Sequence, residues 1–183
     1  GYKRIFSSKL DWVSFKDNLP MNSVTTFTRK HQESMVTKAD KLKLGWCWQI
    51  PTQERLGCGY VSCDEWGDDV LDEIKLNYSD AEIVKSFKFE SGKLKKSWNR
   101  NVISLGLAYH FLEPLQATNI HLTLVQIEML CQKCIRDTKD RTLNPNVISY
   151  YNKHIDNLIE DFKNFINIHY SCDSRVKMTD YNN

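Results

Sequence analysis

The chain has 183 residues, 41% of them hydrophobic and 26% charged, which is typical of one globular unit with a core. Its formal net charge of +2 excludes a strong electrostatic attraction for nucleic acid or acidic lipid. No apolar run approaches the ~20 residues of a membrane span, and nothing resembles a signal peptide. Free thiols without an export signal therefore predict a cytoplasmic protein with no membrane or nucleic-acid partner.

Strands are expected in the first two thirds of the chain. Residues 23–29 are rich in β-branched side chains, which favour strands. Further along, Trp46 and Trp48 alternate with smaller or polar residues up to Pro51. This alternation predicts a hairpin with one aromatic face. Over 68–76, apolar residues recur at helical spacing after two aspartates, which suit the positive end of a helix dipole. This pattern predicts a helix. The predicted strands are 23–29, 46–50, 59–63, 83–90 and 98–107.

The last third is expected to be helical. Apolar residues recur at helical spacing over 121–135, and Asn119 is a candidate N-cap for this helix. A second, longer amphipathic helix is predicted over 147–170, after the breaker Asn144-Pro145. Strands followed by helices predict an α+β fold, with a sheet-rich part over 1–120 and a helical part over 121–183.

Two local patterns suggest other functions but favour ordinary structure. The short basic run Lys93 to Lys96 near Trp98 could suggest an RNA-stacking patch, but a solvated hairpin face is the favoured interpretation. Cys131 and Cys134 form a CxxC inside a helical pattern without further ligands at zinc spacing. We therefore predict no metal site.

One motif is distinctive. The run Trp46-Cys47-Trp48-Gln49-Ile50-Pro51 matches the WxWxIP signature of flavin-dependent halogenases. Residues 106–120, GLAYHFLEPLQATNI, resemble that family's segment GLASGF(L/V)EPLEST(G/S)I, and residues 151–170 resemble its YN…DF…HY helix. The chain is thus similar to tryptophan halogenases over nearly its whole length, in the family's order.

The resemblance implies a function and a set of site residues. Reduced FAD, supplied by a separate flavin reductase, would react with oxygen and halide to give hypohalous acid, which halogenates an electron-rich aromatic such as tryptophan or another indole. The backbone N–H groups of Thr118 and Asn119 correspond to the family's halide site. Leu107 and Ile120 correspond to backbone contacts with the flavin ring.

Gln116 departs from the family, which carries a glutamate there. An amide hydrogen-bonds but cannot act as a carboxylate base, so its catalytic role is open. Glu113 matches a structural position and is left out of the catalytic set. His110 is interpreted as a packed histidine bonded to backbone, with a proton relay as the alternative.

The sequence also predicts a fragment. Gly1 stands where a start methionine would be, and the seven glycines form no GxGxxG fingerprint. The resemblance places that fingerprint and the catalytic lysine upstream of Gly1, so the isolated chain is expected to be inactive. Two alternatives stay open, a flavin monooxygenase and a degenerate, non-catalytic relative, as does a homo-oligomeric state.

Overall fold

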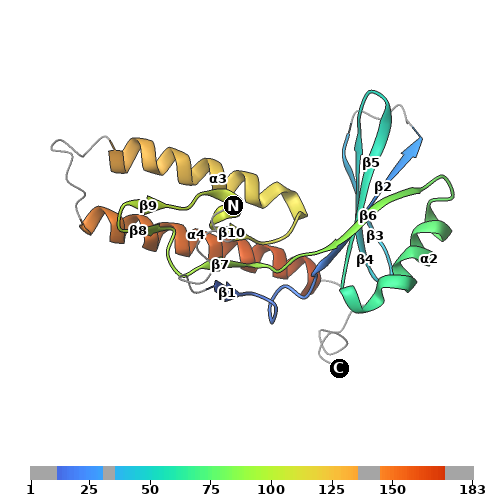
Figure 1. Ribbon diagram of the computed structural model, residues 1–183, viewed down its shortest axis with the longest axis horizontal. Coiled ribbons are helices and arrows are strands. Elements are labelled where there is room, and N and C mark those ends of the chain that lie inside the picture. Colours follow the sequence, from blue (N-terminus) through green and yellow to red (C-terminus); the bar gives the residue numbers. More distant parts are fainter. Residues whose placement is uncertain (1–11, 31–35, 136–144, 172–183) are drawn as a thin grey trace. The chain divides into compact units, whose positions relative to one another are not determined.

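The computed structural model describes residues 12–30, 36–135 and 145–171 (Figure 1). Two compact units make up the chain. One unit is Pro20–Phe89, called here the sheet unit, and the described residues before and after it form the other, called here the helical unit. These units do not coincide with the predicted sheet-rich and helical parts, because residues 90–120 pack with the C-terminal helices.

The sheet unit contains one antiparallel sheet of five strands in the order β3-β4-β5-β2-β6, with α2 (Gly67–Asn77) against one face (Figure 1). The predicted first strand, hairpin and helix are confirmed. The strands are β2 (Ser23–Lys30), β3 (Lys38–Lys41), β4 (Gly45–Pro51), β5 (Arg55–Ser62) and β6 (Glu82–Lys88).

The core of the sheet unit lies between α2 and the sheet. Side chains alternate across a strand, so Cys47 on β4 and its register partner Tyr60 on β5 point toward α2. There they pack with Phe27 of β2 and with Val70 and Ile74 of the helix. Trp46 and Trp48, which flank Cys47 on β4, point to the opposite face of the sheet.

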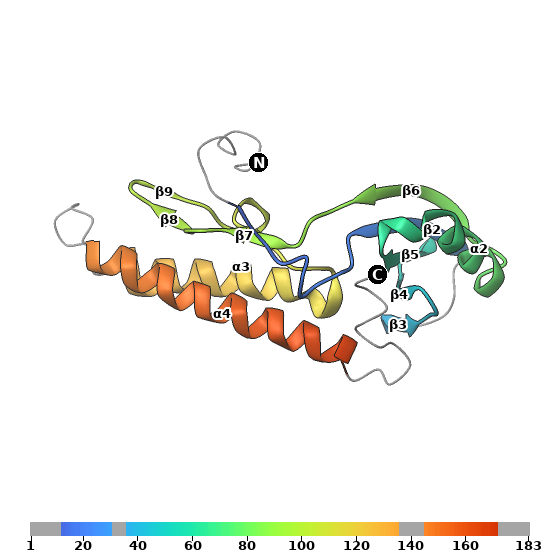
Figure 2. The ribbon, with the colours of Figure 1, turned by 90° about the horizontal axis from the view of Figure 1, so that it is seen from below.

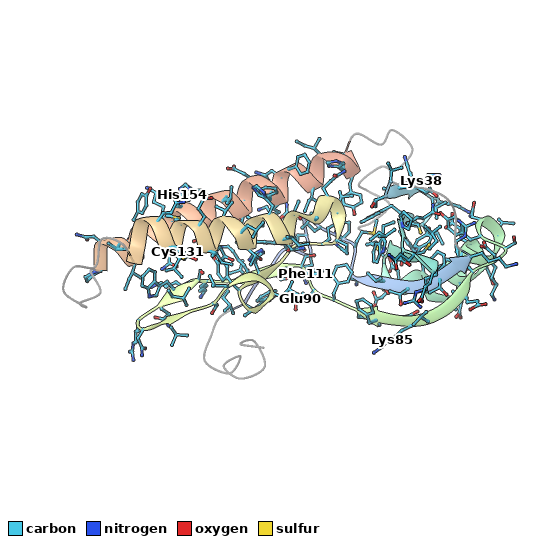
Figure 3. All side chains as sticks on the ribbon, turned by 90° about the horizontal axis from the view of Figure 1, so that it is seen from above. Lys38, Lys85, Glu90, Phe111, Cys131 and His154 are labelled. Atoms are coloured by element: carbon cyan, nitrogen blue, oxygen red, sulfur yellow. The ribbon has the colours of Figure 1, made fainter. Side chains whose placement is uncertain are left out.

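Strand β6 lies at one edge of this sheet and is exposed along its whole length. It ends at Lys88, one residue before Phe89, whose backbone N–H donates to the Asn22 carbonyl at 2.8 Å. Phe87 on the strand is 45% exposed. Figure 3 shows the side chain of Lys85 projecting away from the sheet.

The helical unit combines small antiparallel strand groups with two helices, α3 (Thr118–Met129) and α4 (Pro145–Ser171), which lie side by side (Figure 2). The long predicted C-terminal helix is thus confirmed, and it buries Tyr151, Ile155, Ile159 and Ile166. The three-stranded sheet has the order β1-β7-β10, formed by β1 (Trp12–Ser14), β7 (Gly92–Leu94) and β10 (His110–Phe111).

The predicted strand over 98–107 is wrong. The chain instead forms a hairpin of two short strands, β8 (Trp98–Asn99) and β9 (Val102–Ile103), followed by a 3-10 helix, Gly106–Ala108. Arg100 has a φ of 56° and Gly106 a φ of 53°. Both values lie in the left-handed region, which ends extended structure.

The predicted N-cap is also wrong. Helix α3 begins at Thr118, so Asn119 lies inside the first helical turn. The helix continues into a π-helical segment, Leu130–Ile135, which contains the CxxC pattern. None of the described helices has the length and hydropathy that a membrane crossing requires.

Candidate functional site

The tryptophan pair of the WxWxIP motif lies on β4. The ring centroids of Trp46 and Trp48 are 5.9 Å apart with an interplanar angle of 57°, and both side chains are half-buried. A Cβ at Gly59, the register partner of Trp48, would meet the indole ring at 2.0 Å. The glycine on β5 therefore lets the Trp48 ring lie across the neighbouring strand.

The face of β4 that points toward α2 carries a polar network that the sequence did not predict. Gln49 is 5% exposed and accepts a hydrogen bond from Arg29 at 2.9 Å while donating to Asp40. Arg29 also pairs with Asp80 at 2.8 Å, and this guanidinium lowers the pKa of the Asp80 carboxyl. The sequence signal for this network was a glutamine at a core-facing strand position. Its partners could not be predicted, because they lie on other strands.

The loop before α3 is shaped by two adjacent left-handed residues. Gln116 has a φ of 55° and Ala117 a φ of 52°, and both are exposed. Neither residue has the conformational freedom of glycine, so this backbone geometry costs energy. The two residues turn the chain from buried Leu115 into the N-terminus of α3.

Asn119 holds this loop closed. Its Oδ1 accepts the backbone N–H of Leu112 at 3.0 Å, and its Nδ2 donates to the Glu113 carbonyl at 2.9 Å. The family pattern has glycine or serine at this position, so Asn119 departs from that pattern. The backbone N–H of Thr118 already donates to the Leu115 carbonyl, so an anion there has to share or replace this bond.

Glu113 is completely buried within the same loop. Burial raises the pKa of its carboxyl to about 7, against a partial lowering by a hydrogen bond that the Tyr170 hydroxyl donates to Oε1 at 2.7 Å. Its Oε2 has no hydrogen-bond partner among the described residues. The prediction that Glu113 is structural stays a prediction, but the bond to Tyr170 links the loop to the end of α4.

His110 is buried, but it lacks the expected hydrogen bond to backbone. Neither ring nitrogen has a partner within the described part of the chain, and burial lowers the imidazole pKa to about 4. The ring is therefore neutral at pH 7 and packs edge-on against Tyr109, with centroids 5.7 Å apart.

The basic run is only partly the solvated face that was expected. Lys93 is 7% exposed, and its Nζ lies 2.6 Å from Asp156 of α4. Tyr109 donates to the same carboxylate oxygen at 2.7 Å. Lys95 and Lys96 are exposed.

The two residues matched to flavin contacts are large and exposed. Leu107 is 72% exposed and Ile120 is 66% exposed. Next to Leu107, the left-handed Gly106 donates its N–H to buried Gln126 at 3.0 Å, and a Cβ on Gly106 would meet Thr123 Oγ1 at 2.9 Å. A fixed backbone with exposed apolar side chains suits contact with a flat, partly apolar ring.

Asn152 and Tyr170 of the YN…HY helix acquire partners that sequence alone could not name. Asn152 accepts from the Trp98 N–H and donates to the Trp98 carbonyl, both at 2.8 Å. It thereby completes the hydrogen bonds of β8 in the way a neighbouring strand would. Tyr170 binds Glu113, as described above.

The chain is similar to known proteins over most of its length. The family model "Tryptophan halogenase" matches residues 1–180. Tryptophan 6-halogenase ThaL from Streptomyces albogriseolus is 27% identical over 90% of this chain and 32% of its own length. Tryptophan 7-halogenase RebH from Lentzea aerocolonigenes is 29% identical over 76% of this chain and 27% of its own length.

Solved structures show the same fold. MibH, a lanthipeptide tryptophan 5-halogenase, superposes with a TM-score of 0.84 at 23% identity, covering 97% of this chain and 35% of that one. Xcc4156, a flavin-dependent halogenase from Xanthomonas campestris, gives 0.78 at 26% identity over 91% and 34%. The fold is that of the flavin-dependent halogenases.

The chain belongs to the tryptophan halogenase family, whose model it matches over almost its whole length. It spans about a third of the length of the relatives it matches.

Proposed function

We propose that the chain is the part of an FADH2-dependent halogenase that carries the tryptophan pair and the halide loop. The observation that carries this proposal is the loop Leu112–Asn119 in a chain of this family. The Asn119 amide bonds to Leu112 and Glu113 and so closes a loop that contains two left-handed residues ahead of α3. Bound reduced flavin would supply the electrons that activate oxygen for oxidation of chloride, bromide or iodide.

The halide would bind at the N-terminus of α3. The unpaired N–H groups and the dipole of a helix N-terminus favour an anion. We assign this role to the backbone N–H groups of Thr118 and Asn119, with the Thr118 N–H leaving its bond to Leu115 when halide binds. The backbone at exposed Leu107 and Ile120 would contact the flavin ring.

Gln116 would orient the oxidised halogen or the substrate through its amide. It cannot remove the ring proton as a carboxylate would, so another group or water must take that proton. The half-buried indoles of Trp46 and Trp48 would exclude water on their own face of β4. The substrate would be a small electron-rich aromatic of the tryptophan or indole type, and a flavin reductase would be the partner protein.

A degenerate, non-catalytic relative is the second candidate. The specific observations in its favour are Gln116 and Ala117, which replace the glutamate and serine of the family pattern. Both side chains are exposed on the loop, so loss of their chemistry would leave the fold unchanged.

The test is halogenation by the full-length protein with FAD, a flavin reductase, NADH, halide and a panel of aromatics, with products identified by mass spectrometry. A halide-dependent mass increase is expected, and Gln116→Ala should reduce it at least tenfold. Hydroxylated products without halide dependence would indicate a monooxygenase. If only Gln116→Glu gives product, the natural chain is the degenerate relative.

The 183-residue chain by itself is expected to give no product, because it contains no GxGxxG fingerprint for the flavin pyrophosphate. The same assay on the isolated chain measures this, with the full-length protein as the positive control. Product from the isolated chain would contradict the expectation that these 183 residues lack the binding site for the flavin pyrophosphate.

A further inference from the structure

A cavity of about 540 Å³ lies in the helical unit, between the β8–β9 hairpin and the first turns of α4. Figure 1 and Figure 2 both show this hairpin beside the N-terminal end of α4. The volume lies within the ~300–1,000 Å³ range of small-molecule sites. None of the residues assigned above to halide or flavin lines it.

The cavity wall is strongly basic. Lys96 and Arg100 contribute from the hairpin side and Lys153 from α4, and none of the three has an ion pair with any described residue. The whole chain has a net charge of only +2, so this is a local concentration of positive charge. Unpaired cations converging on one cavity favour an anionic ligand.

The one acidic residue in the wall is neutralised from behind. Asp156 accepts hydrogen bonds through Oδ1 from Lys93 at 2.6 Å and from Tyr109 at 2.7 Å. Lys93 does not line the cavity. Its ion pair with Asp156 neutralises the carboxylate without using a lysine or arginine of the wall. Asp156 therefore does not offset Lys96, Arg100 and Lys153.

The remaining wall residues supply hydrogen-bond donors and an apolar side. Asn99, Asn157 and Ser149 add amide and hydroxyl donors, while Ile148 and Pro145 form an apolar surface. Asn152 is already committed to the Trp98 backbone. One guanidinium and two ammonium groups together can bind several oxygens at once. A phosphate-bearing ligand offers more such oxygens than a single carboxylate does.

We propose that this cavity binds a small molecule carrying a diphosphate group, with Arg100, Lys96 and Lys153 as its anion ligands. The apolar surface at Ile148 and Pro145 leaves room for an organic substituent on the phosphate. The site is separate from the halide loop, so its existence does not depend on the proposed halogenase activity.

The test is isothermal titration calorimetry of the full-length protein with pyrophosphate, ADP and adenosine, without added FAD, because FAD itself carries a diphosphate and would compete for the cavity. Saturable binding of pyrophosphate and ADP with a Kd below about 1 mM is expected. The affinity should fall as salt screens the cations. Adenosine, which has no phosphate, should not bind.

The variants locate the site. Arg100→Ala/Lys153→Ala should weaken pyrophosphate binding at least tenfold, whereas Lys85→Ala removes one exposed cation of the sheet unit (Figure 3) and should change the Kd less than about twofold. Circular dichroism checks that each variant is folded. Absence of saturable binding, equal affinities in the double variant and Lys85→Ala, or equal affinity for citrate each overturns the proposal. Tighter binding of ADP than of pyrophosphate identifies a nucleotide as the source of the diphosphate.

Discussion

Positive φ at ordinary residues shapes the two loops on which the proposals rest. Gln116 and Ala117 turn the chain into α3, and Arg100 turns β8 into β9. A side chain with a Cβ costs roughly 1–2 kcal/mol in the left-handed region. These positions therefore hold conformations that the surrounding contacts must enforce, such as the Asn119 clamp on Leu112 and Glu113.

Ala117→Gly is expected to raise the free energy of unfolding by about 1 kcal/mol, because glycine relieves the left-handed strain and loses little contact at an exposed site. Urea denaturation measures the change. Ala108→Gly, in the 3-10 helix before β10 and without positive φ, is the matched control and should lower it. A loss of stability at both sites contradicts the strain at Ala117.

Gly59 makes room for an indole. Gly59→Ala is expected to cost about 1–3 kcal/mol, because a Cβ would stand 2.0 Å from the Trp48 ring and force it to move. Thermal unfolding and tryptophan fluorescence report the cost and the displacement. In a Trp48→Ala background the same change should cost much less. Equal costs in both backgrounds would show that the ring does not lie over Gly59.

At the scale of elements, hydrophobic periodicity predicted those parts whose burial follows a regular spacing. The β4–β5 hairpin and α4 are such elements. The prediction of one strand over 98–107 was wrong because Arg100 and Asn101 form a turn between β8 and β9, and the turn-forming asparagine was outweighed by the β-branched residues that follow it. Helix α3 begins at Thr118, three residues before the predicted first residue, 121. The side chain of Asn119 bonds back to the loop and does not cap the helix.

The candidate site was predictable only where a motif matched. The tryptophans and residues 116–120 were predicted as site residues by resemblance to the family, and their roles stay predictions. The bond between Tyr170 and Glu113 joins residues 57 positions apart, and no periodicity connects them. The same holds for the Asn152 bonds to Trp98, 54 positions away. Such pairs depend on how α4 packs, which the sequence does not specify locally.

The burial of Glu113 should give the protein a characteristic pH dependence. Unfolded Glu113 ionises near 4.5, whereas the folded protein keeps the proton to about 7. Between these values the folded state binds more protons, so this group lowers the free energy of unfolding as pH rises, by about 3 kcal/mol in all. His110 acts oppositely: its contribution is lost as pH falls from 6.5 toward 4.

Glu113→Gln removes the first contribution and leaves the second. The stability of the variant relative to the natural protein should therefore increase between pH 4.5 and 7, as measured by urea unfolding across that range. The Gln side chain retains a hydrogen-bond acceptor for the Tyr170 hydroxyl. A difference that is constant with pH would mean that Glu113 is ionised in the fold.

At the scale of the whole chain, each unit has a core of its own. Ile74 is completely buried between α2 and the sheet, and Ile159 is completely buried on α4. The unit boundaries at 19/20 and 89/90 separate these cores. A division at 120 would instead group residues 90–120 with the sheet unit, although β7 and β10 pair within the helical unit.

Cavity-forming substitutions distinguish these two divisions. Ile74→Ala should cost about 2–5 kcal/mol and speed amide hydrogen exchange mainly within residues 20–89, because the lost contacts belong to that core. Ile159→Ala, a change of equal size, should act mainly on 145–171 and also on 90–120, whose strands pack with α4. Exchange mass spectrometry resolves these segments. If Ile159→Ala leaves 90–120 protected and Ile74→Ala exposes it, the boundary lies near 120 and the two-unit division is wrong.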